Sequence, residues 1–526
     1  MAAADIVLTG AAVRTLDPSR PYADAVAVKD GLIVAVGGAA DLREWQGPGT
    51  ETVELAGATL VPGLTDAHSH PVWGLELASG TDLSAVTDLA ALRVALRGAE
   101  RREGWVLAWG LNHNAFGGRE PHHALIEEAL DGAPAFIRLY DGHSVLVSAA
   151  GLRAAGIHGP REFVQRASVV CDAEGRPTGH LIEHAAMDLM TRVLPRASFT
   201  ERGARLLELL SGMAATGIAS AHVMDLGGDA LELLASVEET AELPVRLRLA
   251  PWCMPGAGDE ELEWLIAVQR EHGRDWRVGG VKLFMDGTVE GGTAWLEHAD
   301  CHGTGTDAFW PDPAAYSAAV HRLHHAGVGT ATHAIGDAAV RHVLDTVEAL
   351  GARGAGAPVH RIEHIETAPD DQLGRFARLG VAASMQPPHT AYTRADHSDE
   401  WSKRLGPERA ARAWRCRDLR DAGAVLALGS DWPIASYDAR RVLATALAPR
   451  GAAAGHGGLT GLMALEGCTT HAALAAGEST TAGRIAVGYR ADLTALGVDP
   501  VKAPADEIAD APVPLTISSG RITHRT

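Results

Sequence analysis

The chain has 526 residues, and its 46% hydrophobic and 21% charged content is typical of a large globular protein. Its 66 acidic and 46 basic side chains give a formal net charge of −20, which argues against nucleic acid or an anionic membrane as the main partner. The five scattered cysteines, the lack of a secretory leader pattern and the lack of a long apolar stretch predict a cytoplasmic protein.

Short β-prone runs occupy both ends of the chain. At the start they lie near residues 6–8, 25–28 and 32–36, and at the end near residues 491–496 and 514–518. Neither group is large enough to build a core of its own. We therefore expect the two ends to pair into one β-sandwich domain, made of residues 1–57 and 484–526.

Residues 58–483 are predicted to form a (β/α)8, TIM-like barrel, because eight strand-like runs alternate with helix-like segments. The runs cover residues 60–70, 218–225, 245–250, 280–286, 329–333, 360–364, 381–385 and 424–431. In such barrels the chemistry lies at the carboxyl ends of the strands. Residues from about 75 to 200 remain as an insertion after the first strand, and we expect this insertion to roof the active site.

Side chains that bind metal ions stand at the ends of several of these runs. His68 and His70 are two residues apart, so on a strand their imidazoles point to the same side. His333, His364 and Asp431 end three later runs. Each of them alone also fits a structural role, such as a hydrogen-bonded core histidine or a helix-capping aspartate. Together, four histidines and a carboxylate on one rim predict a hydrolytic metal site.

Seven motifs spread over nearly the whole chain resemble one known family. They are residues 62–70 (PGLTDAHSH), 141–144 (DGHS), 281–287 (VKLFMDG), 332–337 (THAIGD), 361–364 (RIEH), 384–387 (SMQP) and 429–433 (GSDWP). As a set they are similar to the amidohydrolase superfamily of metal-dependent hydrolases. Within it they resemble the branch of N-substituted formamide deformylase and the YtcJ-like proteins. The resemblance implies a distorted barrel with a small β-sandwich beside it.

The resemblance also implies roles for individual residues. Asp431 would contact the first metal ion and act as the base. Lys282 matches a bridging lysine, and this role requires carbamylation, because an unmodified ammonium group cannot bind a cation. Four histidines would complete the site, the first two at the more buried ion and the last two at the second: His68, His70, His333 and His364. We expect one or two divalent ions per chain, with zinc as the expected metal.

The implied reaction is amide hydrolysis. Divalent ions lower the pKa of bound water, so that hydroxide can attack a carbonyl group polarised by metal. Asp431 would accept the proton and pass it to the leaving nitrogen. His143 is a candidate to help hold the oxyanion, with a plain turn residue as the alternative. Further predicted substrate contacts are Trp109, His113, Glu290 and Gln386. Glu290 would disfavour anionic substrates.

The leading hypothesis is a hydrolase of non-peptide C–N bonds that acts on an N-substituted formamide or a similar small amide. A deaminase or cyclic-amide hydrolase is the second hypothesis, because the same metal centre attacks those bonds. A non-catalytic scaffold is the third, but such a protein would lack metal ligands. We expect a small-molecule partner, with neither nucleic acid nor membrane, and a homodimer stays open as the assembly.

Overall fold

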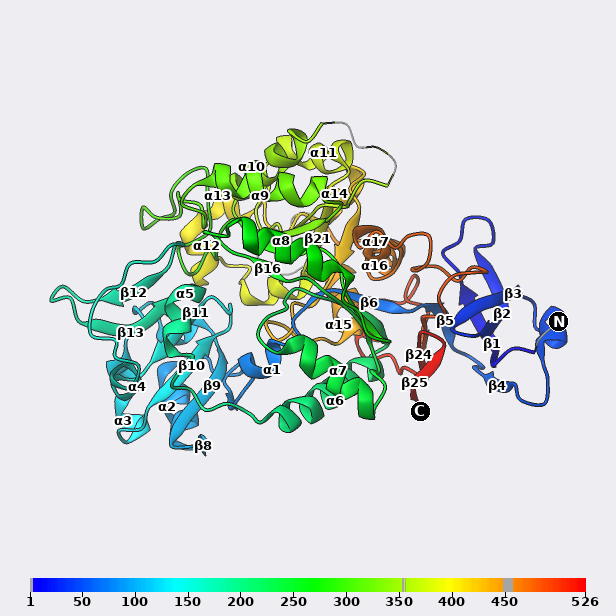
Figure 1. The fold of residues 1–526 in the computed structure, drawn as a ribbon, viewed down its shortest axis with the longest axis horizontal. Helices are drawn as coiled ribbons and strands as arrows, with labels where there is room; N and C mark the ends of the chain where they lie inside the picture. The colour runs from blue at the N-terminus through cyan, green and yellow to red at the C-terminus, as the bar shows by residue number, and fades with distance from the viewer. Residues whose placement is uncertain (1–2, 352–353, 355, 448–456) are drawn as a thin grey trace.

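The computed structural model describes residues 3–351, 354, 356–447 and 457–526. Figure 1 shows an elongated molecule. The strands of both chain ends lie at one end of it, the insertion lies at the other, and helices and parallel strands fill the centre. In the part of the chain that is described, no helix combines the length and apolar character that crossing a bilayer requires.

An eight-stranded sheet joins the two ends of the chain. Its order is β25-β24-β23-β5-β1-β2-β3, and β4 pairs with β1. The key junction is antiparallel pairing of β5 with β23, in which Val61 lies opposite Thr494. The predicted pairing of the two ends is therefore confirmed, while the two-layer sandwich and the domain limits stay predictions. The strands are β1 (Ile6–Arg14), β2 (Tyr22–Lys29), β3 (Leu32–Gly37), β4 (Glu51–Glu54), β5 (Thr59–Pro62), β23 (Leu493–Leu496), β24 (Leu515–Ser518) and β25 (Arg521–Arg525).

Two parallel sheets form the centre, in the orders β17-β15-β14-β6 and β16-β18-β19-β20-β21-β22. Each of the eight predicted runs overlaps one of these strands, and two short strands, β16 and β17, are additional. The strands are β6 (Leu64–Ser69), β14 (Ile218–Val223), β15 (Arg246–Leu249), β16 (Trp252–Cys253), β17 (Trp276–Val278), β18 (Val281–Phe284), β19 (Thr330–Ala334), β20 (Arg361–His364), β21 (Ala382–Met385) and β22 (Leu426–Leu428).

Amphipathic helices alternate with these strands. In α10, buried residues recur at helical spacing, as in Val340, Leu344 and Val347, so one face packs on the sheet. In α9, Pro313 begins the helix after Asp312, whose side chain accepts the Ala314 N–H. The larger helices are α6 (Phe199–Ala215), α7 (Ala230–Thr240), α8 (Asp259–Ala267), α9 (Pro313–His325), α10 (Asp337–Glu348), α11 (Asp370–Leu379), α15 (Ala439–Leu447) and α16 (Gly461–Gly467).

The first and last parallel strands end side by side. The Asp431 N–H donates to the His68 carbonyl at 2.7 Å, and the His70 N–H donates to the Trp432 carbonyl at 2.9 Å. Alternating helices and parallel strands with this adjacency fit a TIM-barrel-like fold. Shorter helices complete the centre and the C-terminal part: α12 (Glu400–Leu405), α13 (Pro407–Ala410), α14 (Cys416–Asp421), α17 (Thr470–Ala475) and α18 (Ala505–Ala509).

The insertion forms a third sheet, in the order β12-β13-β11-β10-β9-β7, with β8 paired to β9. Its strands β12 and β13 form an antiparallel hairpin. The insertion has apolar clusters of its own, one that includes Phe116 and another that includes Phe136. Its elements are α1 (Gly74–Leu77), β7 (Thr81–Asp82), α2 (Leu89–Arg97), β8 (Arg101–Arg102), β9 (Trp105–Leu111), α3 (Glu127–Leu130), β10 (Ala135–Leu139), β11 (Ser144–Val147), α4 (Ala149–Ala154), β12 (Ser168–Cys171), β13 (Pro177–Ile182) and α5 (His184–Met187).

Candidate metal centre

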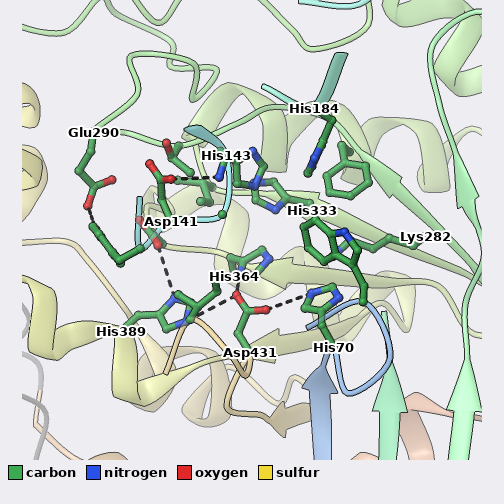
Figure 2. A pocket seen from close by; sticks show the side chains of 18 of the residues that line it. His70, Asp141, His143, His184, Lys282, Glu290, His333, His364, His389 and Asp431 are labelled. Atoms are coloured by element: carbon green, nitrogen blue, oxygen red, sulfur yellow. Dashed lines mark hydrogen bonds and ion pairs between the residues drawn. The ribbon is translucent and has the colours of Figure 1, made fainter. Parts of the chain in front are cut away.

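A pocket opens where the parallel strands end, and histidines converge on it from several elements (Figure 2). Predicted metal ligands line its floor. The insertion contributes Tyr140, Asp141, His143 and His184 to the lining. The segment predicted to roof the site therefore does line the pocket, and its sequence helps to decide what the pocket can hold.

His68, His70 and Asp431 form the first group of metal-ligand atoms. Asp431 Oδ1 lies 3.4 Å from His68 Nε2 and 3.2 Å from His70 Nε2. All three residues are buried, and one ligand atom of each lies within 4.8 Å of the others. Two imidazole nitrogens and a carboxylate oxygen that face one point are a donor set that suits zinc and similar divalent ions. These residues therefore fit a metal ion.

A carboxylate orients each of these two imidazoles from its other side. His68 Nδ1 lies 2.5 Å from Glu363 Oε2, and His70 Nδ1 lies 2.8 Å from Asp225 Oδ2. Such a contact keeps the hydrogen on Nδ1 and leaves the Nε2 lone pair free for a metal ion. Burial, helped by the nearby Lys282 charge, also lowers the pKa of His68 to about 4, so this ring is neutral at pH 7.

A second group consists of His364, His389 and Asp431. Asp431 Oδ2 lies 3.9 Å from His364 Nδ1 and 3.5 Å from His389 Nε2. Both of these nitrogens are buried and lack a hydrogen-bond partner among the described residues. Because buried polar atoms are normally paired, this pair of bare nitrogens is what a metal ion would satisfy. His389 is not predicted from the sequence, because it lies in a short 3-10 helix, η6 (Pro387–Tyr392), and not at a strand end.

His333 and Lys282 stand beside these groups. The ring centroids of His333 and His364 are 4.4 Å apart. His333 Nε2 donates to the Gly287 carbonyl at 3.0 Å, which leaves Nδ1 as the nitrogen able to bind an ion. In the described part of the chain, however, His333 joins none of the three-ligand groups. Its role at a second ion stays a prediction.

Lys282 lies in β18 and is only 1% exposed. Its Nζ is 3.4 Å from His68 Nε2, which places the side chain beside the first group of ligand atoms. Burial lowers the pKa of Lys282 to about 8, so more of the amine is neutral near pH 7 than in a solvent-exposed lysine. Only a neutral amine can take up CO2. The position and the environment of Lys282 therefore suit carbamylation, although the modification itself stays a prediction.

Two of the candidate ligands have backbone conformations that residues other than glycine rarely adopt. His364 has φ +75° and Asp431 has φ +59°. Such residues are found where the surrounding structure fixes a functional side chain at a conformational cost. Both lie where a strand gives way to a loop.

The other sides of the pocket differ in polarity. Trp73, Trp252 and Phe284 form an aromatic wall, with ring centroids 5.2 Å apart for the two tryptophans and 5.1 Å for Trp252 and Phe284. Glu290 lies across the pocket, where it accepts a hydrogen bond from the Tyr140 hydroxyl. Burial, with the neighbouring Glu366 carboxylate, raises the pKa of Glu290 to about 7. Glu290 is predicted from the sequence, but the aromatic wall is not, because its members are not adjacent in sequence.

The other predicted substrate contacts lie outside the set that lines the pocket. His113 stands behind it, with Nε2 2.9 Å from Oδ2 of the lining residue Asp141. Trp109 lies within β9 and Gln386 directly after β21, and neither lines the pocket. His143 does line it, and its Nδ1 lies 2.9 Å from Glu183 Oε2.

Comparison with known proteins places the chain in a family. Residues 51–524 match the model of the Amidohydrolase family called Amidohydro_3. The protein LONG AFTER FAR-RED 3 of Arabidopsis thaliana is 30% identical over 84% of this chain and 78% of its own length. The putative amidohydrolase YtcJ of Bacillus subtilis is 28% identical, over 95% of this chain and 96% of its own. N-substituted formamide deformylase of Arthrobacter pascens is 27% identical, over 99% and 98%.

A solved structure shows the same fold. An uncharacterized metal-dependent hydrolase from Pyrococcus horikoshii superposes with a TM-score of 0.74 at 21% identity, and the match covers 95% of this chain and 99% of that one. The family match spans both parallel sheets, the insertion and the C-terminal strands, and it includes every predicted metal ligand. The chain therefore belongs to the amidohydrolase family and is a metal-dependent hydrolase of carbon–nitrogen bonds.

Proposed function

We propose that this enzyme hydrolyses a small, uncharged amide, with an N-substituted formamide as the leading substrate. The observation that carries the proposal is the donor set of His68, His70 and Asp431 at the floor of a pocket with an aromatic wall. The likeness to N-substituted formamide deformylase along nearly the whole chain supports the choice of amide.

The residues divide the work of hydrolysis. A bound divalent ion would supply a Lewis acid that activates water and polarises the substrate carbonyl. Asp431, whose two oxygens face the two groups of histidines, is placed to accept the proton of the attacking water. It then delivers that proton to the nitrogen of the breaking bond, so that the product leaves as an amine. His143 faces the same pocket from the insertion and is the candidate donor to the oxygen that gains negative charge.

The pocket walls suggest what the amide carries. Trp73, Trp252 and Phe284 offer apolar faces to a hydrocarbon or aromatic group on nitrogen. Glu290 and Glu366 both line the pocket, so an anionic substituent would meet like charge. We therefore expect neutral N-alkyl or N-arylalkyl amides to bind better than amides that carry a carboxylate.

We further propose zinc as the resident ion, two ions bridged by carbamylated Lys282, and a cytoplasmic location. Zinc is supported by the mixture of imidazole and carboxylate donors. The bridge is supported by the position of the Lys282 Nζ beside His68.

A panel of amides tests the substrate. Purified zinc-loaded enzyme is incubated with N-substituted formamides, the matching acetamides and a set of amino-heterocycles, and formate, acetate, amine and ammonia are each quantified. Equal amounts of formate and amine from the formamides support the proposal. Ammonia from the heterocycles without amine from any amide would instead establish the deaminase alternative.

A further inference from the structure

His143 is held by a buried carboxylate on the nitrogen that faces away from the substrate. Its Nδ1 lies 2.9 Å from Glu183 Oε2. Glu183 is fully buried and does not line the pocket, whereas the His143 side chain is 11% exposed and lines it. Because Nδ1 is engaged by Glu183, Nε2 is the nitrogen left for a substrate. A histidine held in this way by a carboxylate recurs wherever an imidazole must be oriented for proton or charge transfer.

The backbone also fixes this pair. The Glu183 N–H donates to the His143 carbonyl at 2.7 Å, so the two residues are joined through main chain and side chain alike. Glu183 itself has φ +68° and ψ 161°, a conformation almost restricted to glycine. It lies between the end of β13 and the start of α5. A residue kept in such a conformation indicates that its side chain is needed where it points.

Gly287 packs against the other oxygen of the Glu183 carboxylate. A Cβ atom added at Gly287 would lie 2.0 Å from Glu183 Oε1 and 2.2 Å from Thr293 Oγ1. Gly287 does not have a positive φ, so its backbone conformation would allow alanine. The Glu183 carboxylate is what excludes a side chain at this position. The Gly287 carbonyl accepts the hydrogen bond of His333, which places the Glu183 contact directly beside the metal-ligand histidines.

We propose that Glu183 is a positioning residue for His143: its carboxylate accepts the Nδ1–H and turns Nε2–H toward the carbonyl oxygen of the substrate amide. A ring that donates from both nitrogens carries a positive charge, and Glu183 supplies the matching negative charge. Gly287 provides the space that the carboxylate occupies. This inference rests on the proposed amide hydrolysis, because only that reaction gives His143 an oxyanion to hold.

A double-mutant cycle tests the pair. The variants are E183Q, H143Q and the double variant, each loaded with zinc and assayed on the best amide of the panel. E183Q keeps a hydrogen-bond acceptor but removes the charge. We expect each single variant to lose about 100-fold in kcat with little change in KM, as for removal of one oxyanion donor. The double variant should lose no more than H143Q alone, because Glu183 acts only through His143.

G287A gives an independent test that leaves both partners in place. It should displace the Glu183 carboxylate and lower kcat to the level of E183Q. The matched control is E127Q, which alters another His–Glu pair of the insertion, His123 and Glu127 at 3.0 Å, outside the pocket. It should keep full activity. Wild-type kcat in E183Q, multiplied losses in the double variant, or loss of bound zinc in E183Q would each overturn the inference.

A readout without substrate separates this inference from the proposed function. In 15N-histidine-labelled protein, the structure predicts a strongly hydrogen-bonded Nδ1–H signal that disappears in H143Q and moves in E183Q. If the wild type shows this signal but hydrolyses no amide, the proposed function fails while the pairing stands. If no such signal exists, the pairing fails even in an active enzyme.

Discussion

Asp225 holds the His70 imidazole by a 2.8 Å contact between its Oδ2 and the ring's Nδ1. The opposite nitrogen of that ring lies 3.2 Å from Asp431 Oδ1. The His70 ring is thus held between two carboxylates. Asp225 sets its tautomer, and Asp431 lies beside the nitrogen that would bind a metal ion. The same arrangement recurs at His68, between Glu363 and Asp431.

The first prediction concerns Asp225. Replacing it by asparagine removes the charge that makes His70 a better ligand and allows the ring to flip, so zinc should bind about 10- to 100-fold more weakly. Competition against a zinc chelator measures this directly. Asp229 lies four residues later and pairs with Arg202 at the surface, so D229N is the matched control and should bind zinc as the wild type does. Equal zinc affinity in D225N would show that Asp225 has no part in the metal centre.

The second prediction concerns Lys282. If its carbamylated side chain bridges two ions, K282M should hold fewer zinc ions per chain than the wild type. Intact-mass analysis of the wild type under mild conditions should show the mass of one added CO2 that K282M lacks. K403M, at an exposed lysine, is the control. If K282M holds as many zinc ions per chain as the wild type, Lys282 does not bridge two ions.

The third prediction concerns Glu290 and pH. Its pKa in the folded protein is raised to about 7 from an ordinary 4.5, so the folded state binds a proton that the unfolded state releases. Stability should therefore fall as pH rises from 4.5 to 7, by less than about 1.4 kcal/mol per unit because Glu290 is only partly buried. E290Q should be more stable than the wild type at pH 8, and the difference should be small below pH 4.5. Urea unfolding at both pH values measures it.

A wild type as stable as E290Q at pH 8 would show that Glu290 ionises freely. The same variant also tests the substrate expectation. Removing this charge should improve the kcat/KM of an amide that carries a carboxylate and leave a neutral amide of the same size little changed. E297Q, outside the set that lines the pocket, is the control.

The fourth prediction concerns Glu478, which is 9% exposed and contacts three arginines. Its carboxylate lies 2.5 Å from Arg277, 2.7 Å from Arg490 and 3.3 Å from Arg246. Although burial opposes ionisation, these charges hold the pKa of Glu478 well below its usual range. The stabilisation is therefore present above pH 4.5 and is lost as pH falls through the lowered pKa.

E478Q should lower the free energy of unfolding by about 3 kcal/mol at pH 7, because it removes a buried carboxylate that three arginines share, two of which then depend on Asp492 as a counter-charge. Urea unfolding at pH 7 measures the loss. E466Q is the control: it removes the carboxylate that pairs with Arg420 alone, and its loss should be much smaller. A loss in E478Q no larger than that in E466Q would mean that the arginines are satisfied by other groups or by water.

The sequence predicts residues that repeat along a strand or end one. His68 and His70 were predicted because their spacing matches the two-residue period of a strand, and Asp431 because it ends the last strand-like run. Their supports, Asp225 and Glu363, carry a weaker signal, since a carboxylate near a strand end has many other uses. Only the fold brings each of these carboxylates within hydrogen-bond distance of one particular imidazole ring.

Other residues could not be found from local pattern. His389 follows two prolines in a 3-10 helix, and Glu183 reaches His143 only because β13 pairs with β11. Conversely, Trp109 and Gln386 were predicted as substrate contacts, yet neither lines the pocket. A place at a strand end predicts the position of a residue along the sheet. The face on which its side chain lies depends on the strand register and on the loops folded over that strand.

The most direct test of the account is amine release from small amides by one preparation in two states. The chain is stripped of metal with a chelator, assayed on the panel, reloaded with zinc and assayed again, with D431N treated in the same way. The account predicts that the stripped protein is inactive, that zinc restores amine release, and that D431N stays inactive. No amine from any amide in the zinc-loaded state, or equal release with and without metal, would contradict it.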